Sequence, residues 1–228
     1  VPTSEPLHRA LTAPHRLADG AHPHSAAVAS ARAACQQARV LHWPLAFAQV
    51  FAAGGFDCVL GNPPWEVSQM GEEEFFATRA PAVAALQGEK RKRAIAELQE
   101  QNPALWQTFV VESQRIAAAN TFYRESGRFA LSAVGKLNTY PLFAETILQI
   151  TAPTGRAGFI VPTGIATDDS TKAYFGHITQ SGRLVSLYDI ENREALFASV
   201  HRSFKFCLLT LGQADAAEFV CYAAQVTQ

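Results

Sequence analysis

The residues best suited to chemistry are Asn62, Pro63, Pro64 and Trp65, which directly follow the apolar run 56–60. Two adjacent prolines fix two φ angles and remove two backbone donors, so the loop is stiff and its carbonyls are free to accept hydrogen bonds. A side-chain amide oxygen, a rigid carbonyl and an aromatic ring suit an exocyclic amine on a flat heterocycle. The run 56–60 suits a short buried strand, whose end would direct these groups at a ligand.

Asn62-Pro63-Pro64-Trp65 resembles the catalytic motif of amino-methylating DNA methyltransferases that use S-adenosylmethionine, most closely the N6-adenine branch in large, type IIG-like restriction-modification methylases. Similar loops occur in methylases of protein glutamine and of RNA guanine. Further segments resemble the adenine enzymes, so the resemblance covers most of the chain from about Arg39; they are 42–57, 135–145, 160–168 and 191–206. It implies an α/β fold, namely part of a Rossmann-like S-adenosylmethionine-dependent methyltransferase fold with a helical insertion after the catalytic loop.

The resemblance also implies roles for the loop residues. The Asn62 side-chain oxygen and the Pro63 carbonyl would each accept one amine hydrogen of an adenine flipped out of double-stranded DNA, and Trp65 would stack on that base. Drawing both hydrogens out of the ring plane turns the nitrogen lone pair toward the methyl donor, so no covalent intermediate is needed. The alternative role of Trp65 is a hydrophobic plug at the strand end.

Five further residues are candidates for the site. Asp57 would orient the loop or lie near the cofactor, although an aspartate that caps a turn is an equal interpretation. Asn138 and Tyr140 fall where the family places a helix near the active site, so they would line the substrate pocket. Phe204 or Phe206 would provide the second face of an aromatic clamp on the base. Their alternation with polar residues is also typical of a half-buried strand, which is the interpretation we favour.

The main cofactor loop of such enzymes is absent from this sequence. They carry an aromatic-x-Gly-x-Gly loop after the first strand and an acidic residue after the second. The pair Gly54-Gly55 precedes a strand, which indicates a turn. We therefore expect a fragment that holds the later half of the catalytic domain, with an incomplete sheet, and S-adenosylmethionine bound mainly by the remaining domains of a larger protein.

The chain divides into four expected segments: an irregular start and a helix at 1–40, the strand and catalytic loop at 41–66, a helical insertion at 67–134, and the later half of the methyltransferase domain at 135–228. Proline and apolar spacing predict a helix that opens with residues 72–76, and further helices at 25–39, 81–98, 103–122, 139–151 and 170–179. A turn is expected at 153–155, and strands at 157–161, 184–190, 204–211 and 218–222, the last ones forming an antiparallel hairpin.

Composition indicates a globular, cytoplasmic protein. Of 228 residues, 48% are hydrophobic and 17% charged, so the chain can bury a core. The four cysteines lack zinc spacing, which favours buried free thiols in a reducing compartment. His22 and His24 have no third ligand, so we expect no metal, and no apolar run reaches the ~20 residues of a membrane span.

The formal net charge of −1 gives no general attraction to DNA, so phosphate contacts must come from local basic surface or another domain. The run 89–93 is a candidate for contacting a nucleic-acid backbone, but a solvated helix face is the interpretation we favour.

Three functional classes remain. The first is an adenine-specific DNA methyltransferase of a restriction-modification or phage-defence protein, inactive as the isolated chain. The second is a methylase of another amine, such as a protein glutamine or an RNA base. The third is a non-catalytic fragment that contacts DNA or a partner but lacks the cofactor site. Cofactor binding by this chain alone separates the first from the third.

Overall fold

The computed structural model describes residues 25–194, 197–198 and 201–222. The predicted irregular start, with His22 and His24, lies outside these residues. The chain forms two compact units that meet between Val50 and Phe51. The first contains α3 (Ser25–Gln37) and α4 (Trp43–Ala46), and α5 (Ala48–Ala52) spans the boundary. The four predicted segments do not follow this boundary and stay a prediction.

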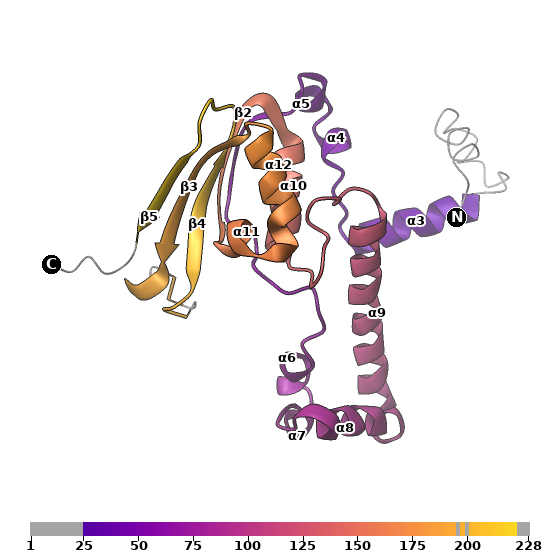
Figure 1. The fold of residues 1–228 in the computed structure, drawn as a ribbon. Coiled ribbons are helices and arrows are strands. Elements are labelled where there is room, and N and C mark those ends of the chain that lie inside the picture. Colours follow the sequence, from indigo (N-terminus) through magenta and orange to yellow (C-terminus); the bar gives the residue numbers. More distant parts are fainter. Residues whose placement is uncertain (1–24, 195–196, 199–200, 223–228) are drawn as a thin grey trace. The chain divides into compact units, whose positions relative to one another are not determined.

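A five-stranded sheet forms the centre of the second unit (Figure 1). Its order is β1-β2-β4-β3-β5, with bounds Phe56–Gly61 for β1, Thr151–Pro162 for β2, Leu184–Glu191 for β3, Lys205–Leu211 for β4 and Glu218–Tyr222 for β5. β1 pairs parallel with β2, β3 pairs parallel with β5, and β4 runs antiparallel to β2 and β3. The chain is therefore α/β, and β1, β2, β3 and β5 end at the same edge of the sheet.

Helices cover one face of this sheet (Figure 1). They are α10 (Thr139–Ile150), α11 (Gly164–Thr167) and α12 (Lys172–Gln180), with the short 3₁₀ helix η1 (Asp169–Thr171) between the last two. The helices and strands share one hydrophobic core, whose buried members include Ala144, Ile147, Phe159, Val161, Tyr174, Ile178, Leu209 and Leu211. Alternate residues of β2 and β4 point into this core, as the period of a strand requires.

The opposite face of the sheet is only partly covered among the described residues: Trp65 stacks on the buried Phe206 at one end, and other positions are open. Leu60 of β1 is 80% exposed, and Leu208 of β4 is also exposed. β1 is an edge strand, and most of its residues are exposed. The prediction of a buried strand at 56–60 was therefore right in its secondary structure and wrong in its burial, because only β2 flanks this strand and nothing described covers its outer face.

The cysteines follow the same pattern. All four are free thiols, as predicted, but only Cys207 is buried, whereas Cys35, Cys58 and Cys221 are exposed. Cys207 lies on β4, on the face that the helices cover, and burial raises the pKa of its thiol to about 12. The predicted burial was wrong for Cys35, Cys58 and Cys221; Cys58 and Cys221 lie on edge strands, and Cys35 lies on α3.

The insertion folds around a small core of its own. It comprises α6 (Glu72–Ala77), α7 (Pro81–Ala84), α8 (Gly88–Gln101) and α9 (Pro103–Glu125). Buried Phe76, Ile95 and Leu98 form its centre. The single helix predicted from Pro81 is two helices, because the chain leaves the helical conformation after Ala84 and Gly88 has a φ of +56°.

The basic run on α8 is partly structural. The Arg91 guanidinium donates to the Glu73 carboxylate at 2.9 Å and to the Ala84 carbonyl at 2.8 Å. Lys92 pairs with Glu89 one turn away. This arrangement agrees with the solvated helix face that we favoured, since much of the charge is used within the insertion.

The later half of the chain matches most of the predicted elements. The turn predicted at 153–155 is instead an irregularity within β2, between the pairs Phe56↔Thr151 and Cys58↔Arg156. β3 and β4 form the predicted antiparallel pair, whereas β5 joins the other side of β3 in parallel. Gly54 lies in the predicted turn before β1. No helix among the described residues is both long and apolar enough to cross a bilayer.

Candidate functional site

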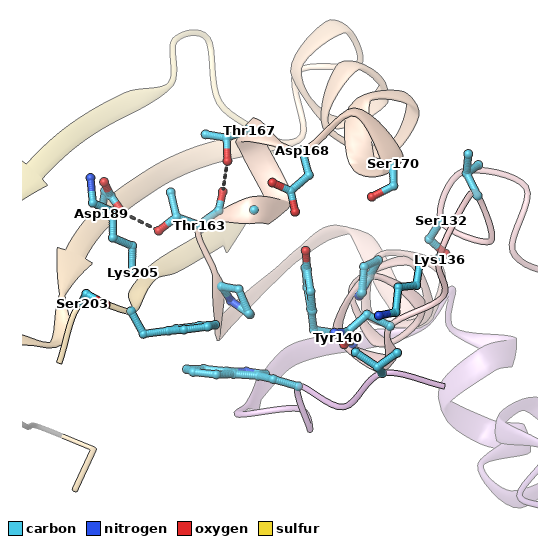
Figure 2. A pocket seen from close by; sticks show the side chains of 18 residues that line it. Ser132, Lys136, Tyr140, Thr163, Thr167, Asp168, Ser170, Asp189, Ser203 and Lys205 are labelled. Atoms are coloured by element: carbon cyan, nitrogen blue, oxygen red, sulfur yellow. Dashed lines mark hydrogen bonds between the residues drawn. The ribbon is translucent and has the colours of Figure 1, made fainter. Parts of the chain in front are cut away.

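A pocket of about 730 Å³ lies at the edge where the parallel strands end (Figure 2). Two loops and two strand ends meet there. The Asn-Pro-Pro-Trp loop leaves β1, Thr163 and Gly164 follow β2, Asp189 lies near the end of β3, and Lys205 begins β4. This is the edge at which open α/β sheets bind ligands.

The structure brings some of the predicted site residues together around this pocket. Trp65, Asn138, Tyr140 and Phe204 all line it. Their sequence positions span 140 residues, so their meeting is a property of the fold. The walls also carry Lys136, Lys205, Asp168 and Asp189, two cations against two carboxylates. A pocket with balanced charges and aromatic walls suits a neutral heterocycle with polar edges.

Other predicted residues lie elsewhere. Asn62 and Pro64 are exposed and Pro63 is buried, and none of the three lines the pocket. Asp57 is exposed on β1, and its predicted roles stay predictions. Phe206 is only 3% exposed and lies behind the pocket wall. Of the two phenylalanines considered for a clamp, Phe204 is therefore the one that a ligand in the pocket can reach.

Four aromatic rings, Trp65, Phe197, Phe204 and Phe206, form what we call the pocket cluster. The rings of Trp65 and Phe204 are nearly parallel, with centroids 5.9 Å apart and an interplanar angle of 12°. Phe206 also stacks on Trp65, at 6.4 Å and 28°. Phe197 meets Trp65 and Phe206 edge to face, at 5.9 Å and 5.0 Å. Trp65 thus has ring contacts on several sides.

Hydrogen bonds fix this cluster in place. The Trp65 indole Nε1 donates to the Ile160 carbonyl of β2 at 3.3 Å. Asn192, which is fully buried, accepts from the Phe197 backbone N–H and donates to the Phe197 carbonyl, both at 3.0 Å. The Asn192 backbone N–H in turn donates to the Phe204 carbonyl at 2.9 Å. Directional bonds of this kind set the position of a ring more closely than packing does.

Tyr140 and Asp168 form a polar pair on the helical side of the pocket (Figure 2). Burial of the phenol, followed by the charge of Asp168 and a hydrogen bond to it, raises the pKa of Tyr140 to about 12. Tyr140 is therefore a neutral donor at physiological pH. Gly164 packs tightly beneath this pair, since an added Cβ would collide with the Asp168 carboxylate and lie 3.0 Å from the Tyr140 hydroxyl.

A second polar pair lies across the pocket. The Thr163 hydroxyl donates to the Asp189 carboxylate at 2.5 Å (Figure 2). The Thr167 hydroxyl donates to the Thr163 carbonyl at 3.3 Å, which closes the short turn after β2. The Thr163 hydrogen bond engages one oxygen of the Asp189 carboxylate, so the turn after β2 sets the orientation of that carboxylate.

The loop after Trp65 pairs with the segment that precedes α10. The Ser68 N–H donates to the Leu137 carbonyl and the Thr139 N–H to the Glu66 carbonyl, both at 2.9 Å. Asn138 lies between these contacts and caps α10, accepting from the Tyr140 N–H at 3.3 Å. Asn138 thus caps α10 and also lines the pocket.

Sequence reasoning missed several residues of this site. Phe197, Asn192, Thr163, Asp168 and Asp189 had no assigned role, although all but Asp189 lie in segments that resemble the methylases. A usable signal was the rule that polar residues at the ends of parallel strands meet at one edge, which points to Thr163, Asp189 and Asn192.

The turn Pro162-Thr163-Gly164 leaves a strand, as a cofactor loop does, and Thr163 and Gly164 both line the pocket. The described residues also hold no cluster of three or more side chains suited to a metal ion.

Comparison with known proteins gave one family and several structures. Residues 25–123 match the family of Eco57I restriction-modification methylases. Similar solved structures include the DrdV–DNA complex, which is 12% identical with a TM-score of 0.41 over 78% of this chain. Another is the ATP-dependent Type ISP restriction-modification enzyme LlaBIII bound to DNA, which is 8% identical with a TM-score of 0.35 over 73% of this chain. No curated protein sequence matches.

The chain spans 16% and 10% of the lengths of those two enzymes. The family match begins at Ser25, before the segment from Arg39 where we placed the resemblance, and it ends at Tyr123. The resemblance of 135–206 lies beyond the match and stays a prediction. The match includes the Asn62–Trp65 loop and most of the insertion.

Proposed function

We propose that this chain is the base-binding and amine-activating part of a DNA methyltransferase, in a restriction-modification or phage-defence protein, that methylates the exocyclic amine of adenine. One observation carries the proposal. The Asn-Pro-Pro-Trp loop leads directly into a pocket walled by two nearly parallel aromatic rings, Trp65 and Phe204. The methyl group comes from S-adenosylmethionine held by segments outside this chain.

The base enters the pocket by leaving the DNA duplex. Flipping costs a few kcal/mol of unstacking, and stacking on an aromatic side chain returns about 1–3 kcal/mol. A base between two rings requires ring planes about 7 Å apart, twice the contact distance of carbon atoms. Phe204 is 40% exposed and precedes β4, so it swings away from Trp65 when the base enters.

The loop then activates the amine. The Asn62 side-chain oxygen and the Pro63 carbonyl each accept one amine hydrogen, and the lone pair of the nitrogen turns toward the methyl group. Asn62 is exposed and does not line the pocket in this structure, so its side chain swings toward the amine on binding. Catalytic hydrogen bonds of this kind tighten once the substrate is bound.

The test is Asn62→Ala in the longer protein that contains this chain. Loss of one of two acceptors should lower the methyl-transfer rate about 10²–10³-fold, with unfolding and cofactor binding nearly unchanged. Asn102→Ala is a matched control, because Asn102 caps α9 through the Leu105 N–H, far from the pocket in the sequence. Near-normal turnover by Asn62→Ala would overturn the mechanism.

The substrate is tested separately. Transfer of a labelled methyl group from S-adenosylmethionine to double-stranded DNA, to a glutamine-containing protein extract and to RNA should label DNA alone. Digestion of the DNA to nucleosides should place the label on N6-methyladenosine. Label in protein or RNA would favour the second functional class, and label on cytosine would reject the adenine assignment.

A second candidate function concerns this chain by itself, which we propose to be unable to bind cofactor. The exposed Leu60 and the uncovered edge of β1 favour this proposal. Calorimetric titration of S-adenosylmethionine should give binding to the longer protein and none to this 228-residue chain. Binding by this chain would show that the cofactor site lies within it.

A further inference from the structure

Thr139 joins both ends of the Trp65 backbone to the start of α10. Its hydroxyl donates to the Pro64 carbonyl at 2.7 Å and accepts from the Glu66 N–H at 2.9 Å. Its own N–H donates to the Glu66 carbonyl at 2.9 Å. A single side chain, 75 residues away from Pro64 in the sequence, therefore bridges the peptide groups before and after Trp65.

The loop has a particular need for an external donor. Pro63 and Pro64 have no N–H, so the loop has few amides of its own for a turn hydrogen bond. The Thr139 hydroxyl compensates by donating to the Pro64 carbonyl and by accepting from Glu66, one of the first amides after the prolines. The Pro64 carbonyl already has a donor, whereas the preceding carbonyl of Pro63 is the one assigned to the substrate amine.

The contact also orients the Trp65 ring. The indole Nε1 is bonded to the Ile160 carbonyl of β2, and the Trp65 backbone is held from the α10 side by Thr139. Asn138 and Tyr140, the neighbours of Thr139, both line the pocket. The start of α10 thus forms a wall of the pocket and at the same time anchors the loop that faces it.

We propose that the Thr139 hydroxyl is a positioning group that holds the Asn62–Trp65 loop in register with the pocket; the proposal rests on the proposed methyltransferase function. Thr139 touches no substrate and acts through Pro64, Glu66 and Trp65. Removing the Thr139 hydroxyl deletes none of the proposed catalytic groups, but it allows the loop to shift. A displacement near 1 Å at the reacting groups lowers a rate by about 10²-fold.

The chain offers matched variants. Thr139→Val keeps the shape of the side chain and removes both hydroxyl contacts, whereas Thr139→Ser keeps the hydroxyl and removes a methyl group. Thr146→Val is the same substitution on the same helix. The Thr146 hydroxyl donates to the Leu142 carbonyl at 2.9 Å, within α10, and both threonines are half-buried.

The first experiment measures single-turnover methyl transfer by the longer protein. Thr139→Val should lower the rate about 10–100-fold without changing the dissociation constant of S-adenosylmethionine, and Thr139→Ser and Thr146→Val should stay within about twofold of the wild type. A wild-type rate in Thr139→Val would overturn the proposal. Equal losses in Thr139→Val and Thr139→Ser would also overturn it, because they would assign the effect to the methyl group.

The second experiment does not depend on methyl transfer. The sequence contains three tryptophans, so Trp43→Phe with Trp106→Phe leaves Trp65 as the sole reporter in this 228-residue chain. In this double-substituted background, adding Thr139→Val should make acrylamide quench Trp65 fluorescence more efficiently. Adding Thr139→Ser or Thr146→Val should leave the quenching equal to that of the background protein. Unchanged quenching in Thr139→Val would overturn the anchoring of the loop.

The two experiments separate the failure of this inference from the failure of the proposed function. If the wild-type protein transfers no methyl group to DNA but quenching responds to the hydroxyl, the function is wrong and the anchoring stands. If the wild type methylates adenine and neither experiment responds to Thr139→Val, the function stands and the positioning role is wrong.

Discussion

Two groups of aromatic rings in this molecule have the same composition, one tryptophan and three phenylalanines, but different surroundings. The pocket cluster lies at the edge of the sheet. The other, which we call the insertion cluster, contains Phe75, Phe76, Trp106 and Phe109. Its rings meet mostly edge to face or tilted, with centroids 4.9 Å apart for Phe75 and Phe76 and 5.2 Å for Phe76 and Phe109.

The difference lies in polar anchoring and in access. Phe76 is fully buried at the centre of the insertion cluster, where packing with Ile95 and Leu98 forms a core. In the pocket cluster, Trp65 is bonded to β2, Asn192 holds Phe197, and Phe204 opens onto a cavity. Ring content alone does not distinguish a core from a binding surface; directed hydrogen bonds beside an accessible cavity do.

The largest effect is expected in the insertion cluster. Phe76→Ala removes a fully buried ring and should lower the free energy of unfolding of the insertion by about 3–5 kcal/mol, measured by denaturant titration. Phe122→Ala on α9 is the control, because the Phe122 ring is exposed and its loss should cost less than about 1 kcal/mol. Equal losses would show that the insertion cluster is not a core.

Trp65→Ala tests the opposite behaviour in the pocket cluster. It should weaken binding of an extruded adenine by about 1–3 kcal/mol, or roughly 5–150-fold, and should abolish the stacking signal of 2-aminopurine placed at the target position. Trp106→Ala should instead lower stability and leave this signal intact. If Trp65→Ala lowers stability and leaves base binding unchanged, Trp65 is a hydrophobic plug.

Alkaline pH should distinguish the two regions. Burial raises the pKa values of Cys207 and Tyr140 to about 12 and that of Tyr174 further, and all three belong to the core beside the pocket. Their protonated forms are favoured in the fold, so the stabilisation is complete below the ordinary thiol and phenol pKa values of 9.0 and 10.0. It is lost as the pH rises from there toward 12.

The measurement is phenol absorbance and circular dichroism between pH 8 and about 12.5. We expect a late phenol component that Tyr140→Phe reduces, and loss of sheet signal within this interval. A late component that persists fully in Tyr140→Phe would contradict the raised pKa of Tyr140.

The smallest effect is expected on α8. Arg91→Ala removes the contacts with Glu73 and the Ala84 carbonyl and should cost about 1 kcal/mol of insertion stability. Arg93→Ala removes an exposed cation of the same helix and should cost less than about 0.5 kcal/mol. A larger loss of DNA affinity in Arg93→Ala than in Arg91→Ala would instead support contact between the basic run 89–93 and the DNA backbone.

Local pattern was sufficient to predict much of the later fold. The helix at 139–151 and the strands at 184–190, 204–211 and 218–222 carry their own caps and apolar spacing, and the structure contains all four. Burial of β1 was not predictable in this way. It depends on what covers the strand, and the composition of residues 56–60 is the same with or without such cover.

The candidate site likewise has some features that local sequence predicts and others that depend on the rest of the fold. The Asn-Pro-Pro-Trp loop is contiguous, so its chemistry could be recognised from the sequence. Phe204 and Phe206 belong to the same alternating pattern in the sequence. In the structure, Phe204 precedes β4 and is 40% exposed, whereas Phe206 lies within β4 and is 3% exposed. The contributions of Thr139 and Asn192 consist of hydrogen bonds to distant or irregular segments, which carry no periodic signal.

The uncovered edge of β1 also affects how the chain behaves in solution. An unpaired strand edge is a template for another copy of itself, and charge or a bulge normally prevents such pairing. Here the exposed residues of that strand include Leu60 and the free thiol of Cys58. We expect the isolated chain to self-associate through this edge as its concentration rises, and under oxidising conditions Cys58 would convert that association into a covalent dimer.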